Sequence, residues 1–174
     1  MSRPDRSGVG AAFMRPAKIA KFLIAILSVA YIFVLLSLCT ANFCYNQSTL
    51  FKQEGMPFDK AYSYINLAIR LNPLKSEYHY QKYLLLNDKE QNAKGLNRKE
   101  KLGLLDETLT DIRKAIDLEP SNASYHMYYG LSLIKRYPRR GGKISVLINE
   151  ELGKSRALKP MSSQYKETFT KYKK

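Results

Sequence analysis

Hydrophobic and polar positions follow two patterns along this chain. Residues 22–40 form an apolar run that contains no charged residue. Downstream of that run, apolar and small residues recur three or four positions apart, the spacing of one helical face, and each series stops shortly before a proline. Proline cannot continue a helix, so each of these prolines predicts a turn. The patterns therefore predict an all-α chain with one long apolar helix followed by several amphipathic helices.

The amphipathic series are copies of one another. Ala-Ile-Arg-Leu-Asn-Pro ends at Pro73, Ala-Ile-Asp-Leu-Glu-Pro ends at Pro120, and the more divergent Ser-Arg-Ala-Leu-Lys-Pro ends at Pro160. Each copy has a small residue five positions before its proline, where we expect a neighbouring helix to approach closely. Such self-similarity is typical of a solenoid, in which each unit packs only on its neighbours. The helical stripes are Ala61, Ile65, Ala68 and Leu71, then Thr108, Ile112, Ala115 and Leu118, then Ile148, Leu152, Ser155 and Leu158.

A second helical pattern follows the turns. The same Tyr-His pair follows the first two prolines at the same distance, as Tyr78-His79 after Pro73 and as Tyr125-His126 after Pro120. After Tyr125-His126, the pattern continues with Gly130 and Leu133. These residues resemble the tetratricopeptide repeat (TPR) family, whose members stack pairs of antiparallel helices. The resemblance implies a short TPR-like α-solenoid of about three helix pairs plus a capping helix. The expected boundaries are 45–75, 76–122 and 123–162 for the repeats and 163–174 for the capping helix.

The chain also departs from the family pattern. Tyr83 stands where the family prefers glycine, Thr108 replaces a small apolar residue, and two histidines replace aromatic residues. The prolines are 47 and 40 residues apart, whereas the family repeat has about 34 residues. We expect polar insertions to hold the excess, roughly at residues 87–101 and 136–143.

The apolar run predicts a membrane anchor. Its 19 residues would form about 28 Å of helix, close to the thickness of the hydrocarbon core, so we expect a transmembrane helix at residues 22–44. Residues 1–21 carry five Lys and Arg against Asp5 alone, which predicts a cytoplasmic N-terminus and repeats, residues 45–174, on the periplasmic or extracytoplasmic side. A cleaved signal peptide or a lipidated Cys39 is the alternative, although no Ala-x-Ala cleavage site is present.

The TPR resemblance implies a binding groove lined by the first helix of each repeat. The family's groove positions correspond to Glu77, Tyr80 and Leu84 in the second repeat and to Ser124, Met127 and Leu131 in the third. The Lys and Asn residues with which some family members hold a C-terminal carboxylate are absent at these positions. We therefore expect a protein partner that presents an apolar or tyrosine-contacting helix.

Positive charge concentrates at the end of the chain. From Lys135 onward there are 12 Lys and Arg against 3 Asp and Glu. This end either keeps the protein soluble or forms a surface for anionic lipid, acidic polysaccharide or an acidic protein. Nucleic acid is disfavoured because the expected topology places the end outside the cytoplasm. The basic patch comprises Arg136, Arg139, Arg140 and Lys143.

The sequence contains no phosphate-binding glycine loop, nucleophile elbow or zinc-protease motif, so we expect neither an enzyme nor a cofactor. His79 and His126 are the only histidines, and we expect a buried, hydrogen-bonded packing role for both. A metal site or a pH-sensitive joint is the alternative, and two histidines without a third ligand bind metal poorly. Cys39 and Cys44 lie in or beside the anchor, so no disulfide framework is expected in the repeats.

Together these features predict a membrane-anchored scaffold that recruits or stabilises a membrane protein complex, with integral membrane subunits as its partners. Two alternatives stay open. One is an accessory protein of bacterial cell-surface polysaccharide synthesis, and the other is an N-anchored mitochondrial import receptor. The sequence alone does not separate these alternatives.

Overall fold

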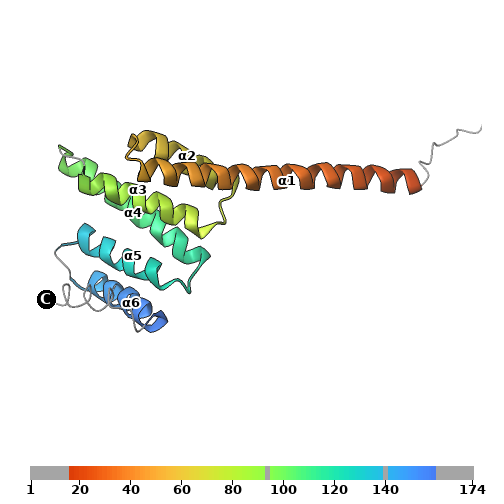
Figure 1. Ribbon diagram of the computed structural model, residues 1–174. Helices are drawn as coiled ribbons and strands as arrows, with labels where there is room; N and C mark the ends of the chain where they lie inside the picture. The colour runs from red at the N-terminus through yellow and green to blue at the C-terminus, as the bar shows by residue number, and fades with distance from the viewer. Residues whose placement is uncertain (1–15, 93–94, 139–140, 160–174) are drawn as a thin grey trace, which may run out of the picture. The chain divides into compact units, whose positions relative to one another are not determined.

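The computed structural model describes residues 16–92, 95–138 and 141–159 (Figure 1). These residues form six α-helices and no β-strand, which confirms the predicted all-α class. The predicted capping helix, residues 163–174, lies outside the described residues. The helices are α1 (Pro16–Gln53), α2 (Phe58–Leu71), α3 (Ser76–Asn92), α4 (Arg98–Leu118), α5 (Ala123–Arg136) and α6 (Lys143–Leu158).

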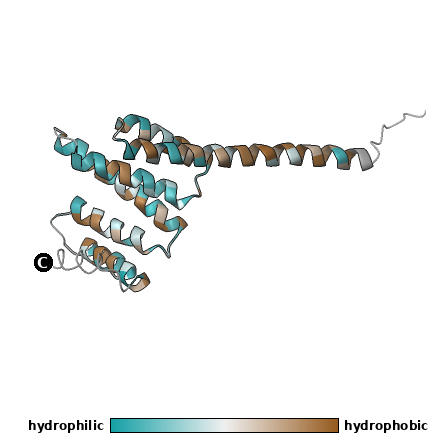
Figure 2. Ribbon diagram, viewed as in Figure 1, coloured by the Kyte–Doolittle hydropathy of each residue, from teal (hydrophilic) through white to brown (hydrophobic). Residues whose placement is uncertain are grey.

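The chain divides into two units, Met1–Ser37 and Leu38–Lys174, and the boundary falls within α1. The described part of the first unit is a helical segment rich in hydrophobic residues (Figure 2). Its apolar side chains are exposed on all sides: Phe22, Leu27 and Phe33 are 67%, 68% and 70% exposed. By length and composition this segment is suited to cross a membrane, and a signal sequence would meet the same criteria.

The second unit arranges its helices so that alternate helices are neighbours. The Tyr78 hydroxyl of α3 donates a hydrogen bond to Asn42 of α1, and the ring centroid of Tyr80 in α3 lies 5.1 Å from that of Tyr125 in α5. Helices α1, α3 and α5 thus form one layer. In the second layer, made of the even-numbered helices, Tyr62 of α2 donates a hydrogen bond to a carboxylate of α4. This is the arrangement expected for stacked pairs of antiparallel helices.

Two hydrophobic cores lie between these layers, and the predicted helical stripes supply much of both. The three small residues five positions before the prolines, Ala68, Ala115 and Ser155, are all 0% exposed, as expected for places where helices approach closely. At the end of the last stripe, however, Leu158 is 46% exposed. The first core contains Ala41, Cys44, Ala61, Ile65, Ala68, Tyr78 and Leu85. The second contains Tyr83, Ile112, Ala115, Tyr125, Tyr129, Leu133, Ile134, Ile148 and Leu152.

The first predicted insertion lengthens two helices instead of forming a long loop. Helices α3 and α4 have 17 and 21 residues, whereas α2 and α5 have 14 each. Asn97 starts α4 because its side chain accepts a hydrogen bond from the Glu100 amide while the Glu100 carboxylate accepts one from the Asn97 amide, both at 2.9 Å. The second insertion, by contrast, falls mainly in the connection between α5 and α6.

Gly130 lies at a close contact between α5 and α6. A Cβ atom at this position would lie 2.8 Å from Cδ2 and 2.9 Å from Cγ of Leu152, so α5 and α6 leave no room for a side chain. Gly103, on an exposed face of α4, has no neighbouring atom within 4 Å of the same position. The two glycines therefore form a matched pair of crowded and open helical sites.

We expect Gly130→Leu to destabilise the second unit by about 1–3 kcal/mol, because the new side chain must displace Leu152. Gly103→Leu is the control, and it should be neutral or stabilising by up to about 1 kcal/mol because leucine favours helices more than glycine does. Thermal unfolding followed by circular dichroism measures both. Equal midpoints for the two variants would show that α5 and α6 do not approach at Gly130.

Candidate partner-binding face

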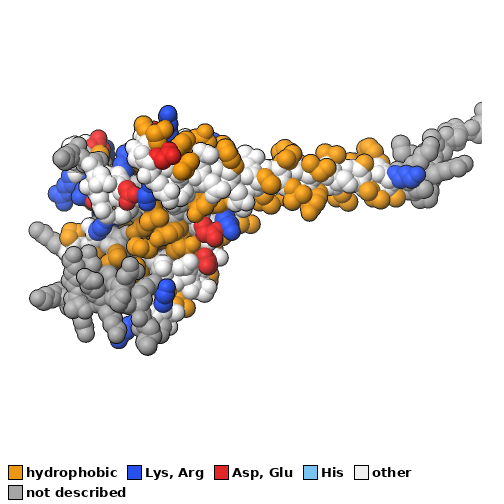
Figure 3. Space-filling model, in the orientation of Figure 1, with side chains coloured by type: hydrophobic (Ala, Val, Ile, Leu, Met, Phe, Trp, Pro, Cys, Tyr) orange, Lys and Arg blue, Asp and Glu red, His pale blue; other side chains and the backbone are white. Residues whose placement is uncertain are grey.

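The structure brings the six predicted groove residues onto two neighbouring helices. Glu77, Tyr80 and Leu84 lie on α3, and Ser124, Met127 and Leu131 lie on α5. Figure 3 shows hydrophobic side chains gathered over the region between these two helices. The face is therefore apolar and aromatic in character, as the sequence predicted.

Four tyrosines join α3 to α5, and we call them the tyrosine cluster: Tyr80, Tyr83, Tyr125 and Tyr128. The ring centroid of Tyr80 lies 5.9 Å from Tyr83, 5.1 Å from Tyr125 and 5.7 Å from Tyr128. Burial raises the pKa of Tyr83 to about 12, and burial together with the neighbouring Tyr128 also raises the pKa of Tyr80. The Tyr80 and Tyr83 hydroxyls therefore stay protonated and uncharged at neutral pH.

Exposure separates the predicted residues into three kinds. Glu77 is exposed, while Tyr80, Leu84, Ser124 and Leu131 are half-buried and still present part of their surface. The exception is Met127, which is only 8% exposed and so offers little surface to a partner. The contact surface available on these two helices is thus centred on Tyr80, Leu84 and Leu131.

The structure adds a residue that the sequence reasoning missed. Leu50 of α1 is 43% exposed and lies seven residues after exposed Phe43, as Leu84 lies seven after Glu77 and Leu131 seven after Ser124. These three leucines lie one on each of α1, α3 and α5, and we call Leu50, Leu84 and Leu131 the leucine row. The seven-residue spacing was visible in the sequence, but Leu50 follows an apolar run in which no single leucine stands out.

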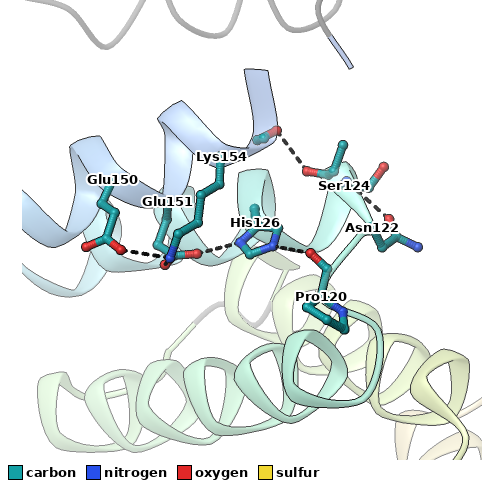
Figure 4. Close-up of polar contacts among 9 residues, drawn as sticks. Pro120, Asn122, Ser124, His126, Glu150, Glu151 and Lys154 are labelled. Atoms are coloured by element: carbon teal, nitrogen blue, oxygen red, sulfur yellow. Dashed lines mark hydrogen bonds and ion pairs between the residues drawn. The ribbon is translucent and has the colours of Figure 1, made fainter. Parts of the chain in front are cut away.

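The two histidines form equivalent joints between successive helix pairs. His126 lies with Nδ1 2.6 Å from a Glu151 oxygen and Nε2 2.8 Å from the Pro120 carbonyl (Figure 4). His79 has the same arrangement: Nδ1 lies 3.4 Å from an Asp111 oxygen, and Nε2 lies 3.2 Å from the Pro73 carbonyl. Both rings are buried, which confirms the predicted hydrogen-bonded packing role.

Charged neighbours support each histidine joint. In the first, Lys82 contacts both Asp111 and Glu107 at 3.0 Å. In the second, Lys154 donates to Glu151 at 3.0 Å. Burial alone would raise the pKa of Glu151, but the hydrogen bonds from His126 and Lys154 outweigh it and lower that pKa below its usual value of 4.5.

No group of three or more potential metal-binding side chains occurs within the described ranges. One hollow of about 550 Å³ lies beside the second histidine joint, between α4, α5 and α6. Its lining mixes Arg113 and Asp117 with apolar residues, and three of its polar side chains, His126, Glu151 and Lys154, already pair with one another. These pairings leave few free polar groups with which to fix a small ligand.

The predicted basic patch is only partly available in the structure. Arg136 makes two hydrogen bonds to the Asp106 carboxylate, at 2.6 and 3.2 Å, so its charge is balanced within the fold. Lys143 is exposed at the start of α6. Arg139 and Arg140 lie outside the part of the chain that the structure describes.

Comparison with known proteins defines the class of fold. No protein-family profile and no curated protein sequence matches this chain. The Arabidopsis OM64 TPR domain is similar with a TM-score of 0.60 and 12% identity, over 78% of this chain and 95% of that domain. The first TPR of Spaghetti (RPAP3), bound to the HSP90 peptide SRMEEVD, is similar with a TM-score of 0.59 and 10% identity, over 77% and 90%. The chain therefore has a TPR-like fold.

The lowered pKa of Glu151 makes a prediction about acid stability. A carboxylate with a depressed pKa in the folded state stabilises the fold above its unfolded pKa, and this contribution disappears as pH falls through the folded pKa. We therefore expect the melting temperature to fall as pH drops below about 4.5, and Glu151→Gln to reduce this fall. The control is Glu150→Gln, because Glu150 is exposed and its ion pair among the described residues is with Lys154 of the same helix. Identical pH profiles for the two variants would contradict the role given to Glu151.

Proposed function

We propose that this protein is a membrane-anchored scaffold whose helical repeats recruit or stabilise a membrane protein complex. One observation carries the proposal: the same chain combines a fully exposed apolar helical segment, suited to cross a membrane, with a TPR-like array. Exposing so many large apolar side chains to water is unfavourable, so this segment requires an apolar environment. An anchored array limits the search for partners to the membrane and its immediate surroundings.

The proposed contact surface is the leucine row together with Tyr80. Leu50 is 43% exposed, and Leu84 and Leu131 are half-buried, so each can still bury apolar area on binding. One leucine per repeat offers regularly spaced contacts to an apolar face of a partner helix. The protonated hydroxyl of half-buried Tyr80 adds a polar tip that suits a helix with mixed polar and apolar residues. An integral membrane subunit that presents such a helix near the bilayer is the partner that fits best.

An acidic peptide fits this face less well. The Spaghetti domain is bound to the peptide SRMEEVD, and recognising such carboxylates calls for Lys or Arg facing the peptide. Here the predicted groove positions carry an acid, a tyrosine, a serine and apolar residues. Nearby Lys135 already lies 2.8 Å from Asn87 and 3.4 Å from Glu90. The composition of the face therefore favours apolar contact over charge pairing.

The contact surface can be tested with two leucines of nearly equal exposure. Leu50 on α1 is 43% exposed and Leu67 on α2 is 42% exposed. A photo-crosslinking amino acid at Leu50 should capture an integral membrane protein in intact membranes, while the same group at Leu67 should not. Leu50→Lys should release that protein after gentle detergent extraction. Retention of the protein by the unmodified chain should change little between about 0.1 and 0.5 M salt, because apolar contacts are insensitive to screening. Equal crosslinking from both positions would refute the leucine row as the contact surface.

The proposed orientation places the N-terminus in the cytoplasm and the repeats on the opposite side. The five cations before the apolar segment support this orientation. Protease added to intact cells or spheroplasts should then destroy an epitope placed after residue 60 and spare an N-terminal tag. Detergent permeabilisation is the control, since it should make both accessible. Protection of the repeats in intact cells would show that the orientation is reversed.

A further inference from the structure

The turn between α2 and α3 carries an exposed leucine. Leu74 is 76% exposed, more than any other large hydrophobic side chain among the described residues. The equivalent position in the turn between α4 and α5, one residue after Pro120, is Ser121, which is also exposed. A serine suits a turn that faces water, whereas a leucine so exposed leaves most of its apolar surface without a contact in the fold. Single exposed leucines are common, so the meaning of this one depends on where its turn lies.

Two contacts fix the level of this turn along α1. Tyr78 in the first turn of α3 donates a hydrogen bond to Asn42 of α1, and Lys52 of α1 pairs with Asp88 of α3 at 2.9 Å. In both contacts the two partners are 36 residues apart in the sequence. Helices α1 and α3 therefore run parallel and keep one register, and the same offset extends back to the turn that precedes α3.

The apolar run of α1 ends at the level of this turn. The offset places Leu74 level with Leu38, and Leu38 and Thr40 belong both to the apolar run and to the second unit. Transmembrane helices tilt by about 20° from the bilayer normal, and packed helices lie about 8–10 Å apart. Points at the same level on α1 and α3 therefore differ in membrane depth by about 3 Å.

Two exposed cations flank the leucine in the chain. Arg70 lies in the last turn of α2, and Lys75 follows Leu74 directly. Lys75 also pairs with Glu77 at 2.9 Å, and both of these side chains are 48% exposed. Long basic side chains next to an apolar residue suit the boundary between lipid tails and phosphates, because their stems stay on apolar surface while their charged ends reach the headgroups.

We propose that the turn between α2 and α3 is a second contact with the lipid bilayer, in which Leu74 enters the interface and Arg70 and Lys75 face the headgroup phosphates. This inference rests on the proposed function, because the apolar segment must be inserted for the turn to reach a membrane. Two points of attachment restrict rotation of the array about α1. Leu50, ten residues beyond Thr40, is then held about 15 Å from the hydrocarbon boundary, within reach of a membrane subunit.

Tryptophan is a suitable probe of this contact because the sequence contains none. Three single-tryptophan variants of the full-length chain are compared in vesicles of phosphatidylcholine and phosphatidylglycerol in equal parts, with and without brominated acyl chains that quench tryptophan in contact with lipid. Phe33→Trp, at a position 70% exposed in the apolar segment, reports insertion of the anchor, and Leu74→Trp reports the turn. Met56→Trp is the control, at a position 39% exposed at the opposite end of α2, about 21 Å away. It also corrects for the preference of tryptophan itself for membrane interfaces.

Phe33→Trp and Leu74→Trp should lose emission in the brominated vesicles, whereas Met56→Trp should keep its emission there and be quenched by dissolved acrylamide. Circular dichroism should show the same helix content in all three variants, since the three side chains are exposed. Quenching by lipid at Phe33→Trp without quenching at Leu74→Trp would refute the contact and leave the anchor intact. Absence of quenching at Phe33→Trp would refute the anchor and, with it, the contact.

Two other results would also overturn the proposal. Equal quenching by lipid at Leu74→Trp and Met56→Trp would show that the array lies on the bilayer without a preferred end. Protection of Leu74→Trp from both lipid and acrylamide would show that protein, and not lipid, covers the turn.

Discussion

Stacking in this protein depends on the space left by one small side chain in each helix pair. Ala68, Ala115 and Ser155 are completely buried at equivalent positions. Because Ala68 and Ala115 are small, the helix that follows each of them can approach closely, and its tyrosine joins the same core. Gly130 creates a similar approach between α5 and α6.

Hydrophobic packing is not directional, so the histidine joints have a different part in the fold. Each joint connects the proline carbonyl of the turn before the histidine's helix to a carboxylate on the helix after it, and hydrogen bonds of this kind depend on direction. The two joints are unequal. His126 lies within 2.8 Å of both its partners, whereas His79 lies 3.2 and 3.4 Å from its own. Lys82 compensates in the first joint by contacting two carboxylates.

Repetition made most of the fold predictable. The prolines marked the turns, and the periodic stripes identified most of the core, because both depend on local geometry. The capping signal of Asn97 and Glu100 was also present in the sequence, yet the polar composition around it suggested an insertion and not two longer helices. Propensity and capping thus decided the structure of a segment that has no regular apolar stripe.

The candidate site was less predictable because it depends on long-range contacts. The resemblance supplied Tyr80, Leu84 and Leu131, but the burial of Met127 requires contacts that spacing on one helix does not reveal. Arg136 was assigned to a basic patch, whereas its charge is balanced by Asp106, 30 residues earlier in the chain. Such pairings depend on which helices the fold brings together, and a linear pattern does not contain that information.

The composition of the first core has a consequence for synthesis of the chain. Ala41 and Cys44 of α1 are covered in part by Tyr78 and Leu85, which the ribosome adds about 40 residues later. At about 5–20 residues per second, this delay lasts about 2–8 s. During that interval this part of α1 presents unpaired apolar side chains to its surroundings. The newly made chain therefore depends on prompt arrival of α2 and α3, or on a chaperone, to avoid aggregation at its first repeat.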